Sequence, residues 1–367
     1  MKAIISKAEI VSLIGKIQSV VSPKPTLPVL ANILLEAVDD QLILSATDLT
    51  VSMRAYTDAK VLEEGSITLP ARRFFHLIRE LTAPQVEIHC TSPDVALINA
   101  GSSHFKIHGM HHSEFPSMPD LSDAIGCSVP CQVLKEMLTR SSFAVSRENN
   151  PLEVLHGVCL QSIDSKGVFI GTDGKRLAKL EADLNLTEEH RGSYVIPLKA
   201  VEEIIKILDT KESDAKIFLM GDKIGIEVGP VTLISKLLSG QYPDVNRIIP
   251  KKSETGITLH REELISLLRQ VSLFTSETSS SVRFTFAGSE LHLSANSGEI
   301  GEGKVSMPVN YAGAKLEIAF NPSYFLDILR HSKDETVHFD VTDSYNPGLV
   351  YDSTSALFVI MPMRLDA

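Results

Sequence analysis

The chain has 367 residues, of which 43% are hydrophobic and 22% are charged, and its net charge at pH 7 is −11. These values are ordinary for a soluble globular protein, and the length fits two or three domains. No apolar run reaches the ~18 residues of a membrane span, and the first residues lack the apolar stretch of a signal peptide. We therefore expect a cytoplasmic protein. The negative net charge, taken alone, argues against binding to nucleic acid.

Two helical patterns each occur three times. The first covers residues 5–17, 129–141 and 259–271, where apolar residues align with the i, i+3, i+4 spacing of an amphipathic helix. The second begins at Leu69, Ile196 and Phe320, with a proline at or near each helix start. Its copies are 127 (196 − 69) and 124 (320 − 196) residues apart. This spacing is the size of a domain and too long for a solenoid repeat.

Strands are predicted between and after the helices, from runs of alternating or β-branched residues. In chain order they cover residues 33–37, 41–46, 51–56, 85–90, 95–100, 104–108, 157–161, 167–172, 178–182, 216–220, 223–228, 231–237, 282–287, 290–295, 303–309, 336–341, 348–352 and 356–361. Turn signals at 38–41, 221–223 and 287–290 fit hairpins. Each third therefore has the order helix, strands, helix, strands, which is itself a duplication.

This order predicts an α+β fold of three similar domains, in which helices pack on antiparallel sheets. Proline- and aspartate-rich runs that begin at Phe115 and Tyr242 indicate the domain boundaries. We expect domains at residues 1–125, 126–250 and 251–367.

No metal or cofactor site is predicted. Cys127 and Cys131 have roughly metal-ligand spacing, but no second Cys or His pair accompanies them at the spacing of a zinc finger. The four histidines between His104 and His112 fall in a predicted strand and loop, and the Glu of a zinc-protease helix is absent. We expect ordinary thiols and a solvated His-rich loop.

One turn leaves an enzymatic alternative open. The segment Gly171-Thr-Asp-Gly-Lys-Arg faintly resembles a phosphate-binding loop, but its spacing differs and Arg176 stands where the hydroxyl residue belongs. A hairpin with a positive-φ glycine is the structural alternative. Other catalytic motifs are missing, so we expect a protein without catalytic activity and keep an enzyme with a phosphate site at this turn as the alternative.

Although the whole chain is acidic, many of its Lys and Arg residues lie on the predicted helices. Every predicted helix carries two or three of them: Lys7, Lys16, Arg72, Arg73, Arg79, Lys135, Arg140, Lys199, Lys206, Arg261, Arg269, Arg330 and Lys333. If the helices face one direction, that face is basic although the protein is acidic. Few aromatic residues accompany the cations, so such a face favours contacts with the phosphate backbone over base stacking.

Several segments together resemble a known family over essentially the whole chain. They begin at Lys24 (KPTLPVL), Leu69 (LPARRFF), Gly171 (GTDGKRLA), Tyr242 (YPD), Phe320 (FNPSYFLDIL) and Val359 (VIMPMRL). In order and at this spacing they resemble the bacterial DNA sliding clamps, the β subunits of DNA polymerase III. The resemblance implies a head-to-tail homodimer that closes into a ring, with helices lining the hole and sheets outside. It also implies a processivity factor that encircles duplex DNA without reading its sequence.

The resemblance further implies partners that share one peptide pocket: the replicative polymerase α subunit, the clamp-loader δ subunit, translesion polymerases and repair proteins. The residues that match this pocket are Leu155, Thr172, Gly174, Lys175, Arg176, Leu177, Pro243, Arg247, Ile248, Asn321, Tyr324, Val359, Ile360, Met361, Pro362, Met363 and Arg364. The chain departs from the family at Lys175, where His is frequent, at Ser279, where some members have an aromatic residue, and in its two residues beyond Leu365.

Two further sets of residues follow from the same resemblance. Contacts with DNA in the hole are expected from Lys24, Arg72, Arg73, Asn149 and Lys199. The dimer contact is expected between Phe105 and Ile107 of one copy and Leu273 and Phe274 of the other.

Overall fold

The computed structural model describes residues 1–122, 124–148, 150–209, 212–252, 256–276 and 280–364. These divide into two compact units. Unit 1 contains residues 1–135, 187–190 and 199–238, and unit 2 contains residues 136–186, 191–198 and 239–367. Each unit draws on two of the three expected domains, because sheets continue across the expected boundaries. The boundaries at 125 and 250 therefore stay predictions.

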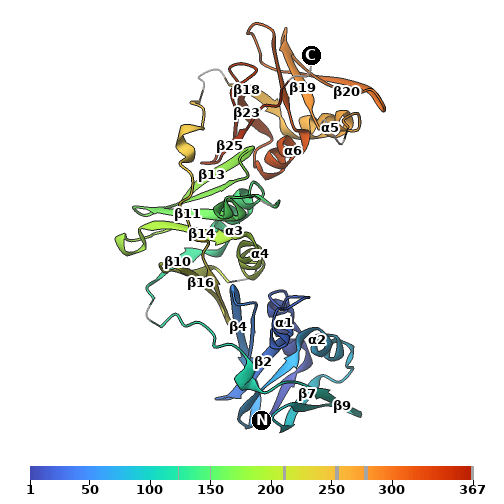
Figure 1. Cartoon of the computed structure of the whole chain (residues 1–367), viewed down its shortest axis with the longest axis vertical. Coiled ribbons are helices and arrows are strands. Elements are labelled where there is room, and N and C mark those ends of the chain that lie inside the picture. Colours follow the sequence, from blue (N-terminus) through green and yellow to red (C-terminus); the bar gives the residue numbers. More distant parts are fainter. Residues whose placement is uncertain (123, 149, 210–211, 253–255, 277–279, 365–367) are drawn as a thin grey trace. The chain divides into compact units, whose positions relative to one another are not determined.

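Six helices occupy the positions of the two repeated patterns: α1 (Lys7–Ile17), α2 (Ala71–Glu80), α3 (Cys131–Ser142), α4 (Leu198–Ile207), α5 (Arg261–Ser272) and α6 (Pro322–His331). Helix α1 packs beside α2, and α5 packs beside α6 (Figure 1). Their buried stripes contain the aligned positions of the repeat, Ile10, Leu13 and Ile14 in α1 and Leu264 and Leu268 in α5. No helix among the described residues is long and apolar enough to cross a membrane.

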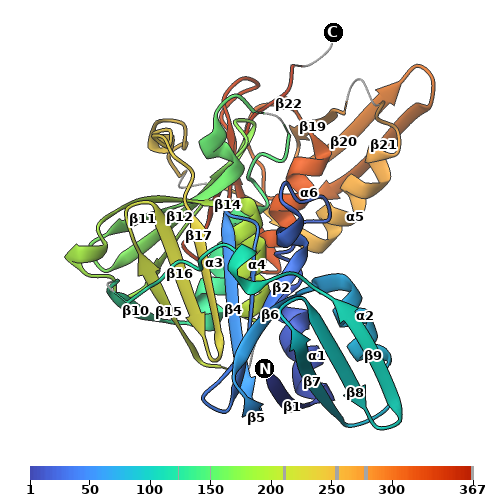
Figure 2. The same ribbon diagram turned by 60° about the horizontal axis from the view of Figure 1, so that its bottom comes forward.

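Unit 1 contains two antiparallel sheets. The smaller has the order β5 (Lys60–Glu63), β1 (Lys2–Ser6), β7 (Gln85–Ser92), β8 (Val95–Ala100) and β9 (Ser103–His108). The larger has the order β10 (Gly126–Pro130), β15 (Asp214–Leu219), β16 (Lys223–Val228), β17 (Val231–Lys236), β4 (Val51–Asp58), β3 (Gln41–Thr47), β2 (Asn32–Val38) and β6 (Gly65–Pro70). Figure 2 shows β15, β16, β17 and β4 side by side.

Unit 2 repeats this plan. Its larger sheet has the order β14 (Gly192–Pro197), β11 (Gly157–Ile163), β12 (Lys166–Thr172), β13 (Arg176–Asp183), β25 (Leu357–Ile360), β24 (Gly348–Tyr351), β23 (Thr336–Asp340) and β18 (Ile257–His260). Its smaller sheet has the order β21 (Gly301–Pro308), β20 (Glu290–Ser297), β19 (Val282–Ala287) and β22 (Leu316–Phe320). The α+β prediction of helices on antiparallel sheets is confirmed.

The predicted strands are all present within a few residues, but β5 and one class of short strand were not predicted. A short strand directly precedes every helix: β1, β6, β10, β14, β18 and β22. The first helical pattern consequently begins as strand, and α1 starts at Lys7, two residues later than the pattern implied. In β1 only Ala3 and Ile5 are buried, so the alternation is too short to separate from the helical stripe that follows.

The core of unit 2 includes a cluster of four phenylalanines, Phe284, Phe320, Phe325 and Phe339, all fully buried. Their ring centroids lie 5.1–5.9 Å apart, within the range of favourable aromatic pairs. Three strands and α6 contribute one ring each, so the cluster fixes α6 against both sheets of the unit.

Arg140 of α3 was counted among the cations of a possible basic helix face, but it is not open to solvent. It is 4% exposed. Its guanidinium donates to the His331 carbonyl (2.7 Å), to Glu136 and Thr354, and to the Asp352 carboxylate (2.5 Å). Burial of this ion pair is compensated by these additional hydrogen bonds, so Arg140 connects α3 with the end of α6 and the β24–β25 loop.

Substitution of Arg140 tests this connection. We expect Arg140→Ala to lower the free energy of unfolding by about 3–5 kcal/mol, because Asp352 then stays buried without its partner. Urea unfolding followed by circular dichroism measures the change. Lys166→Ala is the control, because its ion pair with Glu181 is exposed and such pairs contribute under about 1 kcal/mol. If the two substitutions lowered the free energy of unfolding equally, Arg140 would not stabilise the fold through its buried ion pair with Asp352.

Candidate functional site

A tight turn between β12 and β13 organises the candidate pocket in unit 2. Thr172 Oγ1 accepts a hydrogen bond from the Gly174 amide (3.1 Å) and donates to the Arg176 carbonyl (2.6 Å). Asp173 Oδ1 accepts from the amides of Lys175 (2.9 Å) and Arg176 (3.0 Å). Gly174 adopts φ = +86°, a conformation that favours glycine. The turn is therefore fixed by its own side chains.

This geometry contradicts the phosphate-loop alternative. The amides of Gly174, Lys175 and Arg176, which a phosphate would need, are already bonded, two of them to a carboxylate that would repel an anion. Gly171 has a packing role, because a Cβ there would lie 2.1 Å from the Ser141 carbonyl oxygen. The enzymatic alternative is not supported.

The same turn occurs in unit 1, which confirms the repeat at the level of single hydrogen bonds. Asp48 Oδ1 accepts from the amides of Thr50 and Val51, and Thr47 Oγ1 donates to the Val51 carbonyl. Leu49 takes the place of Gly174 and is forced to φ = +74°. The two aspartates differ in what else they bind: Asp173 pairs with Arg176 in its own turn, whereas Asp48 pairs with Lys199 of α4.

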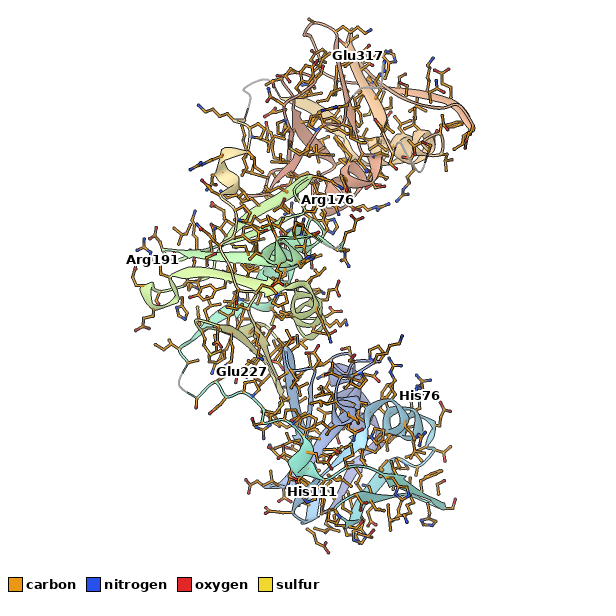
Figure 3. All side chains as sticks on the ribbon, viewed as in Figure 1. His76, His111, Arg176, Arg191, Glu227 and Glu317 are labelled. Carbon is orange, nitrogen blue, oxygen red and sulfur yellow. The ribbon has the colours of Figure 1, made fainter. Side chains whose placement is uncertain are left out.

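Arg176, labelled in Figure 3, is held on several sides. Its Nε donates to Asp173 (3.1 Å), and its Nη1 donates to Asp327 of α6 (2.7 Å). The guanidinium carbon lies 4.5 Å from the ring centroid of Tyr324 and 5.6 Å from that of Phe143. The side chain is 10% exposed. Arg176 therefore connects the turn with α6 and holds Tyr324 in place.

Strand pairing brings the two longest runs of predicted pocket residues together. Arg176 pairs with Ile360, Leu177 pairs with Val359, and the Met361 amide donates to the Lys175 carbonyl (2.9 Å). Leu177, Val359 and Ile360 are buried, whereas Met361 is 39% exposed. The three buried residues belong to the core of unit 2, and Met361 lies at the surface directly after them.

The last residues of the run approach the start of α6. The Met363 amide donates to the Ala319 carbonyl (2.7 Å), close to Asn321 and Tyr324. Asn321 has a structural task of its own, because its side chain caps α6 by accepting from the Ser323 amide (2.9 Å). Pro362 and Met363 are half-buried, and Arg364 is exposed.

Residues 242–248 are anchored beside the same sheet. Tyr242 is buried and donates to the Ile170 carbonyl (3.4 Å), and burial raises the pKa of its hydroxyl. Lys179 of β13 donates to Asn246 (2.7 Å). These contacts hold the short helical turn η5 (Val245–Arg247) and leave Ile248 45% exposed. Pro243, Arg247 and Ile248 thus lie next to the strand that carries Leu177.

Leu155 is buried at the end of the turn η3 (Glu153–His156), where its carbonyl accepts from the Ser146 amide (2.9 Å). The neighbouring Leu152, which is 53% exposed, is not among the residues predicted from the sequence. Phe143 and Asp327, which contact Arg176, were not predicted either. The spacing of Tyr324 and Asp327, one helical turn apart on α6, is the signal that could have identified Asp327.

The residues expected to contact DNA differ in their surroundings. Lys24, Arg72 and Arg73 are exposed. Lys199 is half-buried, donates to the Val20 carbonyl (3.1 Å) and pairs with Asp48. Asn149 lies outside the described residues, as do Ser279 and the residues beyond Arg364. Lys199 therefore holds the Asp48 turn, and its charge is partly neutralised.

The residues expected at the dimer contact lie at sheet edges or beside them. Phe105 of edge strand β9 is 40% exposed, and Ile107 is buried. Leu273, directly after α5, is 73% exposed. Phe274 packs on Gly303 of edge strand β21, since a Cβ on Gly303 would lie 2.4 Å from its ring.

The described residues contain no group of three or more His, Cys, Asp or Glu side chains placed to hold a metal ion. Burial raises the pKa of the thiols of Cys127 and Cys131, which opposes the thiolate form that a metal needs. His104 bonds to Asn99 and His111 bonds to Ser113, so these rings are engaged locally.

Comparison with known proteins covers the whole chain. The family models of the N-terminal, central and C-terminal domains of the DNA polymerase III beta subunit match residues 1–119, 128–244 and 246–364. The beta sliding clamp of Chlamydia pneumoniae is 52% identical over 365 residues, which are 100% of this chain and 99% of the relative.

Solved structures agree with these matches. The DNA polymerase sliding clamp of Bacillus subtilis is 27% identical with a TM-score of 0.95, and the match covers 100% of both chains. The sliding clamp of Pseudomonas aeruginosa, solved bound to griselimycin, is 28% identical with a TM-score of 0.94, again over 100% of both chains.

Proposed function

Because the chain belongs to the family of DNA polymerase III β subunits, the β sliding clamps, we propose that two copies form a ring around duplex DNA. In this proposal the ring has no catalytic activity and keeps polymerases on their template. The observation that carries the proposal is the threefold repeat of one domain plan, with edge strands available at both ends of the chain. We propose that it works in the cytoplasm, where bacterial chromosomal DNA is replicated.

The proposed partner site is the pocket of unit 2. Its base of Leu177, Val359 and Ile360 is apolar, and exposed Ile248 and Met361 can contact an apolar peptide side chain. Such a mixture of apolar surface and a few fixed polar groups suits a short linear motif. The proposed partners are the polymerase α subunit, the clamp-loader δ subunit, translesion polymerases and repair proteins.

Substitution of Met363 tests the pocket. We expect Met363→Ala to weaken binding of apolar motif peptides by roughly 1–3 kcal/mol, because a flexible apolar contact is lost. Fluorescence polarisation with a labelled peptide measures the affinity. Met118→Ala, a change of the same residue type in unit 1, is the control and should leave the affinity unchanged. An unchanged affinity in Met363→Ala would remove this residue from the pocket.

The exposed arginines of α2 are proposed to contact phosphates. We expect the double substitution Arg72→Ala, Arg73→Ala to reduce the slope of log K against log salt by up to about 2, because each phosphate contact contributes about 0.9. Lys199→Met should change the slope less, because Asp48 already neutralises this charge. Fluorescence anisotropy of a labelled duplex over a salt series measures both slopes. A larger change in Lys199→Met than in the double variant would refute this ranking.

The repeat also predicts how two copies join. Inside the chain, β4 pairs with β17 and β13 pairs with β25, so the fourth strand of one domain meets the last strand of the next. The remaining members of these two sets are β21 and β9, and both are edge strands. We propose that β21 of one copy pairs with β9 of the other, which closes the ring in a head-to-tail arrangement.

The register follows from the hairpins. Gly303 and Met53 occupy equivalent positions in two copies of the repeat. Met53 pairs with Ala46 in the β3–β4 hairpin, and Gly303 pairs with Ala295 in the β20–β21 hairpin. The closing pair Ala100–Ser103 of β8 and β9 corresponds to Val228–Val231 of β16 and β17. Since Met53 pairs with Leu233, Gly303 should pair with Phe105, and Glu302 should therefore pair with Lys106. The predicted register thus puts opposite charges face to face.

A charge exchange tests this register. We expect Lys106→Glu and Glu302→Lys each to weaken the dimer, since like charges then oppose one another at both junctions of the ring, and the combined variant to recover. Leu273→Asp should yield monomers, because it puts a charge into an apolar contact. Mass photometry over a dilution series measures the dissociation.

Lys60→Glu on β5, the opposite edge of the same sheet, is the matched control and should leave the dimer intact. Failure of the combined variant to recover would rule out the Lys106–Glu302 pairing. Dimers of Leu273→Asp at micromolar concentration would remove Leu273 from the interface.

A further inference from the structure

A network of four polar side chains crosses one face of the smaller sheet in unit 1 and ends on edge strand β9. Lys2 of β1 pairs with Glu87 of β7 (3.4 Å), and the Asn99 side chain of β8 donates to the other oxygen of Glu87 (3.0 Å). The Asn99 side-chain oxygen lies 2.9 Å from His104 Nδ1 on β9. Strand pairing sets these contacts, because Asn99 pairs with Glu87 on one side and with His104 on the other.

This network determines which nitrogen of the His104 imidazole carries a proton. The hydrogen bond from Asn99, together with the ion pair to Lys2, holds the pKa of Glu87 below its ordinary value, so this carboxylate is an acceptor. Asn99 therefore turns its amide group to Glu87 and its oxygen to His104, which makes Nδ1 the donor. In the neutral imidazole Nε2 then carries a lone pair. Because Nδ1 is directed at β8, Nε2 lies on the side of the open sheet edge.

The proposed pairing of β9 with β21 puts a lysine of the second copy opposite this imidazole. Since Gly303 should pair with Phe105, the neighbouring pair along the two antiparallel strands is Lys304 with His104. Lys304 is exposed and pairs with Glu302 on its own strand (2.6 Å). An ammonium group has three N–H donors, so that of Lys304 can bind Glu302 and also donate to an imidazole nitrogen.

We infer that His104 joins the two copies as a neutral imidazole, whose Nε2 accepts a hydrogen bond from Lys304 of the second copy. The inference rests on the proposed head-to-tail dimer and deepens it, because it names a side chain that makes closure of the clamp ring dependent on pH. His104 is thereby a specificity residue of the junction, since its neutral form accepts a lysine and its charged form repels one.

The charges around His104 give the direction of this dependence. On the face that His104 shares, the predicted junction combines the cations Lys106 and Lys304 with the carboxylate Glu302, whereas Lys2 and Glu87 neutralise each other. The strands behind the junction add no charge beside it, because β8 has no charged residue and positions 294 and 296 of β20 are Ser and Asn.

The junction thus already has one positive charge in excess when His104 is neutral. Protonation removes the acceptor at Nε2 and adds a second positive charge opposite Lys304. Because the dimer favours the neutral imidazole, its dissociation constant should rise as the pH falls through the range in which histidine gains a proton, about pH 8 to 5.

Mass photometry of the full-length protein over a dilution series, at about pH 8 and about pH 6 in the same low salt, tests the inference. We expect the dissociation constant of the dimer to be roughly three- to thirtyfold higher at the lower pH, because a like-charge pair then forms at both junctions of the clamp ring. In His104→Gln, which keeps a neutral side chain with an acceptor, the change should fall below about twofold.

Two further variants make the test specific. Lys304→Glu should reverse the sign, so that this dimer is tighter at the lower pH, because protonated His104 then faces a carboxylate. His108→Gln is the matched control on the same face of β9. The predicted register places uncharged Ile300 opposite His108, so this variant should keep the response of the unmodified protein.

The outcomes separate this inference from the proposed dimer. A dimer of the unmodified protein with equal dissociation constants at both pH values would overturn the inference and leave the clamp ring intact. A response that persists in His104→Gln, or one that disappears in His108→Gln, would overturn it as well. If the unmodified protein stayed monomeric at micromolar concentration and at both pH values, the proposed ring itself would fail, and this inference with it.

Discussion

Hydrogen bonding between β4 and β17, and between β13 and β25, makes each large sheet continuous across two sequence repeats. Every other feature of function depends on this pairing. It brings Arg176 and Leu177 beside Val359 and Ile360, although about 180 residues separate them in the chain. It also leaves β9 and β21, the strands equivalent to the paired ones, at edges of the two smaller sheets, which is the condition for joining a second copy.

Polar side chains secure the packing around these sheets. Arg140 connects α3 with the end of α6 and with Asp352, and Arg176 connects the β12–β13 turn with Asp327. In unit 1, buried Glu203 of α4 accepts from Ser19 just after α1 and from Lys206. Hydrogen bonds require fixed directions, whereas hydrophobic burial does not. These contacts therefore orient the elements that they join more specifically than burial alone would.

The sequence predicted helices, most strands and the repeat, because aligned apolar positions such as Ile10 and Leu264 report burial directly. It could not predict the short strands before each helix. Two buried residues in each of β1, β10 and β18 are too few to establish alternation, and the buried residues of β6, β14 and β22 are consecutive and do not alternate. It also treated Arg140 and Lys199 as open cations. Only the structure reveals that Arg140 is buried and that Lys199 is paired with Asp48, because these partners are distant in sequence. The proposed pocket residues came from resemblance, and Asp327, which binds Arg176 but belongs to no motif, was not predicted.

The central claim is that two copies of this chain close into a ring by pairing their remaining edge strands. Negative-stain electron microscopy of the purified protein, with class averages, tests it most directly. The account predicts closed rings with a central hole wide enough for a DNA duplex and six lobes, since each copy contributes three domains. Class averages that contain only compact particles without a hole, at concentrations where the protein is dimeric by mass, would contradict it.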